Sequence, residues 1–123
     1  MASNIFYDSY AVLEFLDGNN SFKHYFSEYD GVTTLYNLME VYYITLRDQG
    51  QDKAHKVLEL LRPIIIYPTI EDVEESMKFK LENKHKKFSY TACLGYIFAR
   101  RNKIRFLTGD EGFKNMSNVE FVK

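Results

Sequence analysis

The sequence predicts an α/β protein, a three-layer α/β/α sandwich with a mainly parallel five-stranded sheet. Short apolar runs alternate with longer segments of helical spacing along the whole chain. Strands that alternate with helices are joined by right-handed crossovers and pair in parallel, which places helices on both faces of the sheet. The length of 123 residues, 46% of them hydrophobic, suits one domain with its own core, spanning residues 1–123.

The first half of the chain contains two of the predicted strands. Ile5, Phe6 and Tyr7 form an apolar run typical of a strand buried on both faces, and helical spacing follows from Tyr10. After a turn at residues 17–20, Ser21 can cap a short helix over 22–29. Val32 and Thr33 predict the second strand.

Two helices follow the second strand. Thr34 can cap a helix over 35–48, and apolar residues on several faces predict that this helix is largely buried. Its main apolar stripe consists of Leu35, Leu38, Met39, Tyr42 and Leu46. Gly50 closes this helix, and the stripe of the next contains Ala54, Val57, Leu58 and Leu61.

The second half of the chain supplies the other three strands. Residues 64–67 predict a buried strand that ends at Pro68, and Thr69 with Asp72 resembles a capping box. The helix that follows has an apolar stripe of Ile70, Val73, Met77 and Leu81 and a charged face that we expect in solvent. Ser89 can cap a helix over 90–101. Residues 104–108 and 119–122 predict the last two strands.

Three acidic residues are candidates for a functional site. Asp8 follows the first strand, Asp110 follows the fourth, and Glu40 lies on the helix predicted to be buried. Asp8 and Glu40 each have a purely structural alternative, since Asp8 can simply cap a helix and Glu40 can lie on a solvent-exposed edge of its helix. Ligands gather at the carboxyl ends of strands in open α/β sheets, and carboxylates are ligands for hard divalent cations.

Composition excludes several classes of protein. The formal net charge of −1 gives no global field that would attract nucleic acid. The single cysteine, Cys93, excludes an internal disulfide, and we expect it to be buried. No segment is apolar enough to span a membrane and no secretory signal is visible, so we expect a cytoplasmic protein. His24, His55 and His85 match no zinc spacing, and we expect them at the surface.

Four segments together resemble the motifs of PIN domains, in order and across essentially the whole chain. Residues 5–9 resemble the first, a hydrophobic strand that ends in Asp before a small hydroxyl residue. Residues 33–42 resemble the second, residues 88–96 the third and residues 107–113 the fourth. The chain length is similar to that of stand-alone VapC-type toxins of prokaryotic toxin–antitoxin pairs.

The resemblance implies an endoribonuclease that depends on Mg²⁺ or Mn²⁺, with Asp8, Glu40 and Asp110 as its catalytic and metal-binding acids and Thr108 as a supporting hydroxyl. It also implies an RNA substrate, a cognate antitoxin protein and a homodimer. The run of Lys84 to Lys87 could contact RNA phosphates, although such runs are more often simply solvated. The tyrosine-rich surface could stack RNA bases or form a protein interface.

The third motif departs from the family pattern at one position. It normally reads Ser-x-x-Asp, but here Ala92 occupies the position of the acid, and no Asp or Glu occurs from Asn83 to Gly109. We therefore expect weak metal binding and little or no cleavage. Ala92 is either natural, in a chain that has lost its chemistry, or an introduced Asp→Ala change that disarms a toxin.

The alternative is a catalytically inactive PIN-fold module that binds an antitoxin partner or RNA. Other acid-based α/β proteins fit less well. A haloacid-dehalogenase-like phosphatase would need a second Asp where Tyr10 lies, and a response-regulator receiver would need an Asp after the third strand, where residues 67–69 have none. A nucleotide-binding P-loop is absent from the sequence.

Overall fold

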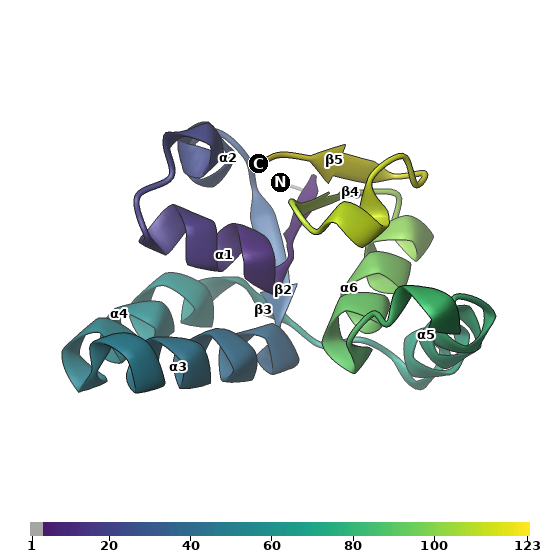
Figure 1. The fold of residues 1–123 in the computed structure, drawn as a ribbon, viewed down its shortest axis with the longest axis horizontal. Coiled ribbons are helices and arrows are strands. Elements are labelled where there is room, and N and C mark those ends of the chain that lie inside the picture. The colour runs from purple at the N-terminus through teal and green to yellow at the C-terminus, as the bar shows by residue number, and fades with distance from the viewer. Residues whose placement is uncertain (1–3) are drawn as a thin grey trace.

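The computed structural model describes residues 4–123 and contains a five-stranded sheet with helices on both faces (Figure 1). The strands are β1 (Ile5–Tyr7), β2 (Gly31–Thr34), β3 (Ile65–Ile66), β4 (Arg105–Thr108) and β5 (Val119–Phe121). The α-helices are α1 (Ser9–Leu16), α2 (Lys23–Ser27), α3 (Leu35–Gln49), α4 (Gln51–Leu61), α5 (Ile70–Glu82) and α6 (Tyr90–Arg101). The 3₁₀ turns are η1 (Asn20–Phe22), η2 (Arg62–Ile64), η3 (Lys84–Lys86) and η4 (Glu111–Phe113). The predicted α/β class is confirmed.

All neighbouring strands of the sheet are parallel, in the order β3-β2-β1-β4-β5. The chain winds from β1 outward to β2 and β3, then returns to the other side of β1 for β4 and β5. The direction of winding therefore reverses between β1 and β4, which pair with Phe6 opposite Phe106. In open α/β sheets this reversal opens a crevice at the carboxyl ends of the two strands, where ligands bind.

The two faces of the sheet have separate aromatic-rich cores. Alternation along β1 directs Ile5 and Tyr7 to the core shared with α1, α3 and α4, and Phe6 to the core shared with α5 and α6. Along β4, Leu107 belongs to the same core as Ile5 and Tyr7, and Phe106 belongs to the same core as Phe6. A Cβ atom on Gly95 of α6 would lie 2.6 Å from the Phe6 ring, so this glycine allows α6 to lie directly on β1.

Helices α3 and α5 are oriented differently from the prediction. The buried residues of α3 are Asn37, Val41 and Thr45, so the prediction that α3 is largely buried is wrong. Much of its predicted apolar stripe is exposed, and the large exposed side chains of α3 are Leu35, Tyr36, Met39, Tyr43 and Leu46. In α5 the buried residues are Asp72, Ser76 and Phe79, while Ile70, Val73 and Leu81 of the predicted stripe are exposed.

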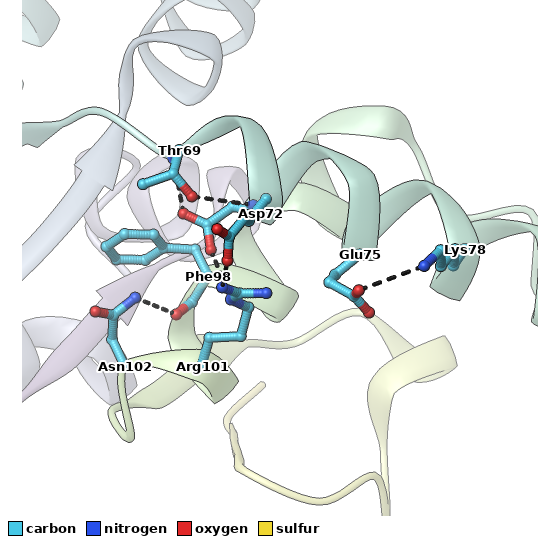
Figure 2. Close-up of polar contacts among 8 residues, drawn as sticks. Thr69, Asp72, Glu75, Lys78, Phe98, Arg101 and Asn102 are labelled. Carbon is cyan, nitrogen blue, oxygen red and sulfur yellow. Dashed lines mark hydrogen bonds and ion pairs between the residues drawn. The ribbon is translucent and has the colours of Figure 1, made fainter.

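A polar cluster explains how α5 buries an acid. Asp72 is only 3% exposed, and it completes a capping box with Thr69, as the sequence predicted. Arg101 of α6 pairs with the same carboxylate, with its Nε atom 3.0 Å from Asp72 Oδ1, and its second contact is to Glu71 at 3.1 Å. Figure 2 shows Arg101 pointing at Asp72 beneath the start of α5. The cluster joins the two helices that cover one face of the sheet.

Smaller differences concern element ends and the third strand. β3 is an edge strand of two residues, and both are only partly buried, so the buried strand predicted over 64–67 is too long and too deep. The short helix predicted over 22–29 is divided into η1 and α2, and Asn19 rather than Ser21 caps η1. Cys93 is buried and the three histidines are exposed, as expected. Within residues 4–123, the helices are too short or too polar to cross a membrane.

Candidate functional site

The candidate site lies at the carboxyl ends of β1 and β4, where the sheet winding reverses. Asp8 follows β1 directly, and Asp110 lies two residues after the end of β4. Both line an open pocket of about 490 Å³, together with Ala92 and Ser89 from the start of α6. The structure thus brings two of the three predicted acids, and the position of the missing acid, to one place.

Asp8 occupies the N-cap position of α1, but its side chain makes no capping hydrogen bond. Instead, Asp8 Oδ2 accepts a hydrogen bond of 2.7 Å from the Thr108 hydroxyl, and both residues are buried. The Asp8 carboxylate is therefore held by Thr108 and does not cap α1. Burial raises the pKa of Asp8 to about 7; hydrogen bonds from Thr108 and the Ser9 backbone lower it, while Asp110 and Glu40 raise it.

Thr108 connects the two acids. Its hydroxyl donates to Asp8 and accepts a hydrogen bond of 3.1 Å from the Asp110 backbone N–H. The Asp110 side chain accepts from the Gly112 backbone N–H at 2.9 Å, which caps η4. Asp110 is exposed, so one of its oxygens shapes the turn while the carboxylate remains accessible from the pocket. The Thr108 hydroxyl therefore contacts both acidic residues, while its supporting role in catalysis stays a prediction.

Glu40 lies on α3 beside the start of α1. Its Oε1 atom accepts a hydrogen bond of 2.7 Å from the Ser9 hydroxyl, and Ser9 in turn accepts one of 3.0 Å from Asn37 Nδ2. Asn37 is completely buried and also completes the capping box of α3 with Thr34. Glu40 does not line the pocket, but its charge acts on Asp8. Sequence reasoning missed Asn37, for which the Thr-x-x-Asn spacing of the capping box was the available signal.

Ala92 is the third residue of α6, where its backbone N–H donates to the Ser89 hydroxyl at 3.0 Å. The corresponding residues of α3 and α5 are Asn37 and Asp72, and both return a side-chain hydrogen bond to their N-cap residue. The cap of α6 is therefore half of a capping box. The side chain of an acid at position 92 could either point into the pocket or accept a hydrogen bond from the backbone N–H of Ser89 and complete the capping box.

Carboxylate oxygens are the ligands that a hard divalent cation prefers, but the pocket contains too few carboxylates for a full ligand set. Among residues 4–123, no group of three or more His, Cys, Asp or Glu side chains is arranged to hold a metal ion. Asp8 and Asp110 share the pocket, whereas Glu40 is directed to Ser9. An acid at position 92 would supply a third carboxylate from the pocket wall.

Two lysines contact η4, and only Lys86 belongs to the basic run that the sequence singled out as a possible RNA contact. Lys123 lines it, with Nζ 3.4 Å from Glu111 Oε1, and its ammonium lies 5.5 Å from the centre of the Tyr10 ring. Lys86 Nζ donates a hydrogen bond of 2.8 Å to the Gly112 carbonyl. No sequence motif marked Lys123, since its place depends on where β5 ends relative to η4.

Comparisons with known proteins identify the fold. No protein-family model and no curated protein sequence matches the chain. A toxin–antitoxin complex from Klebsiella pneumoniae matches with a TM-score of 0.75 at 15% identity, over 95% of this chain and 96% of that one. Mycobacterium tuberculosis VapC20, a toxin that cleaves the sarcin-ricin loop, matches with a TM-score of 0.82 at 15% identity, over 98% and 100%.

A third solved structure, PAE2754 from Pyrobaculum aerophilum, matches with a TM-score of 0.71 at 12% identity, over 99% of this chain and 92% of that one. At these identities the likeness concerns the fold, and it extends over nearly the whole of each chain. The PIN-like fold that the sequence motifs predicted is therefore confirmed.

Proposed function

We propose that this chain is a VapC-type endoribonuclease of a toxin–antitoxin pair, impaired because Ala92 stands where an acid is expected. The observation that carries the proposal is the shared pocket of Asp8, Asp110 and Ala92 at the reversal point of the sheet. The fold it shares with VapC20 and with a chain of a toxin–antitoxin complex supports the same assignment.

The proposed cofactor is Mg²⁺ or Mn²⁺, held weakly by Asp8 and Asp110, with Glu40 adding negative charge. A bound divalent ion would supply a water molecule of lowered pKa and stabilise the leaving oxygen of a phosphodiester. The residues of the chain then have distinct tasks. Thr108 orients the Asp8 carboxylate, Asp110 offers an accessible carboxylate, and Ser9 fixes Glu40.

The cleavage assay that tests this proposal compares the chain with its Ala92→Asp form on a structured RNA, with Mn²⁺ and with EDTA. We expect cleavage by the Asp form only, and only with Mn²⁺. Ala92→Asn is the matched control, because an amide can complete the cap of α6 but adds no charge to the pocket. Equal cleavage by the unchanged chain would show that no additional acid is needed and would overturn the role given to Ala92.

The second candidate function is a PIN-fold module that binds RNA or an antitoxin without chemistry. Ala92 is the observation that favours it. The two candidates differ in the cleavage assay, since a pure binding module would not become a nuclease through the single change Ala92→Asp. The intact contacts among Asp8, Thr108 and Asp110 favour the first candidate.

We also propose that the chain forms a homodimer through an apolar face over α3, α5 and the start of α6. Two adjoining hollows on this face share Tyr36 and Val73. One is also lined by Tyr90 and Leu94, and the other by Tyr67. Tyr67 and Tyr90 are 76% and 70% exposed, which is much apolar surface to leave in water. A cognate antitoxin is the second proposed protein partner.

A further inference from the structure

We infer that Lys86 and Lys123 form a phosphate-binding rim around the acidic pocket, which holds the backbone of an RNA strand. This inference rests on the proposed function and adds the residues that would bind the substrate. The sequence singles out only the basic run 84–87. In the structure Lys86 makes a specific contact with Gly112, and Lys123 at the end of the chain lines the pocket.

The two lysines hold adjacent residues of the same turn. Lys86 from η3 donates to the Gly112 carbonyl at 2.8 Å, and Lys123, after β5, pairs with the Glu111 carboxylate at 3.4 Å. Both contacted residues belong to η4, which begins directly after Asp110. Both ammonium groups therefore contact the turn that directly follows Asp110, the accessible acid of the pocket.

Both ammonium groups keep capacity for a phosphate. A lysine has three N–H donors, and the Gly112 carbonyl occupies one of those of Lys86. The Lys123–Glu111 pair is exposed, with the two side chains 52% and 65% accessible, and such a pair contributes little. A phosphate can therefore displace Glu111 or bind beside it at small cost.

Aromatic rings beside Lys123 favour a nucleic acid over an acidic peptide. The Lys123 ammonium lies 5.5 Å from the centre of the Tyr10 ring and 5.9 Å from that of Phe121. Lys114 approaches the same Phe121 ring at 5.7 Å. Both rings are only partly buried, and bases stack on exposed aromatic faces while cations hold the phosphates between them.

Binding of a fluorescently labelled single-stranded RNA, measured by anisotropy in EDTA over a series of salt concentrations, tests the inference. Lys86→Gln retains a donor for Gly112 but removes the charge, and Lys123→Gln removes the other charge. We expect each change to lower the slope of log K against log salt by about 0.7, the contribution of one phosphate contact to a single strand. Lys86→Arg is expected to restore the slope.

Lys56→Gln is the matched control. Lys56 is exposed on α4, which lies on the other side of the molecule from the β4–β5 connection (Figure 1). Slopes for Lys86→Gln and Lys123→Gln equal to that of the control would overturn the inference. So would absence of RNA binding by the unchanged chain at low salt, or binding of polyglutamate but not RNA through the same lysines.

The inference and the proposed function fail in different experiments. If Ala92→Asp cleaves RNA but the lysine changes leave the salt slope unchanged, the nuclease proposal stands and the rim is wrong. If the lysine changes lower the slope but no variant cleaves, the rim stands as a binding surface and the nuclease proposal is wrong.

Discussion

Thr108 donates a hydrogen bond of 2.7 Å to the Asp8 carboxylate across 100 residues of sequence, and this contact joins the ends of β1 and β4. The same hydroxyl accepts the Asp110 backbone N–H. One side chain thus holds the Asp8 carboxylate and the backbone of Asp110. The contact depends on the parallel pairing of Tyr7 with Leu107, which brings the two strand ends level.

Thr108→Val should disturb both acids while preserving the shape of the side chain. We expect the pKa of Asp8 to rise from its value of about 7, because a hydrogen bond that favours its charged form is lost. We also expect a loss of about 1–3 kcal/mol in the free energy of unfolding, because the Asp110 N–H loses its partner. Titration of Asp8 by NMR and urea denaturation measure the two effects, and Thr108→Ser should retain both contacts.

Asp8 should make the protein less stable as the pH rises. Its pKa is raised from 3.8 to about 7 in the folded chain, so between these values the native state binds more protons than the unfolded state. The protonated carboxyl is favoured in the fold, and its stabilising contribution is present below pH 4 and lost as the pH rises through 7.

Asp8→Asn should therefore remove this pH dependence. Above pH 7 we expect the Asn form to be more stable than the unchanged chain by up to about 4 kcal/mol, since one pKa unit corresponds to about 1.4 kcal/mol. Below pH 4 the two should be similar. Urea denaturation at several pH values measures the difference, and parallel curves for the two proteins from pH 4 to 8 would contradict the pKa assignment.

Arg101→Met should destabilise the protein through the buried carboxylate of Asp72. Asp72 is 3% exposed and would lose its cation, which we expect to cost about 3 kcal/mol. Arg47→Met is the matched control, because both side chains of the Arg47–Asp48 pair are exposed and such a pair contributes little to stability. Thermal or urea denaturation compares them, and equal effects would refute the role of Asp72 in joining α5 to α6.

Tyr36→Lys should separate the proposed homodimer. Tyr36 is shared by both hollows of the apolar face, and a charge there would have to be buried in the interface. Size-exclusion chromatography with light scattering should give a dimer mass for the unchanged chain and a monomer mass for the variant. Tyr29→Lys, at an exposed tyrosine in the α2–β2 connection, is the control and should remain dimeric. A monomer mass for the unchanged chain would refute the dimer.

The positions of the strands and of the pocket could be predicted from the sequence, whereas the buried faces of α3 and α5 could not. Apolar runs located β1 and β4, and their parallel pairing was enough to bring Asp8, Thr108 and Asp110 together. In α5 the apolar stripe containing Ile70 and Val73 faces outward. Periodicity alone could not reveal this, because the partner that allows Asp72 to face inward, Arg101, lies on another helix.

The contacts of Glu40, Lys86 and Lys123 could not be predicted from the sequence for a similar reason. Glu40 was predicted from its motif, but its bond to Ser9 depends on the packing of α1 against α3. The positions of Lys86 and Lys123 depend on how η3 and the end of β5 meet η4. Such contacts between distant loops leave no pattern in the sequence. The strands of a parallel sheet are visible as short apolar runs, and their ends can therefore be located.

The central claim is that the acidic pocket lacks one carboxylate, and Mn²⁺ binding tests it most directly because it needs no RNA substrate. Calorimetric titration would compare the unchanged chain, Ala92→Asp and Ala92→Asn at pH 8, where Asp8 is charged. The account predicts at least about tenfold tighter binding by the Asp form, equivalent to about 1.4 kcal/mol, and no gain for the Asn form. Equal affinities in all three proteins would contradict it.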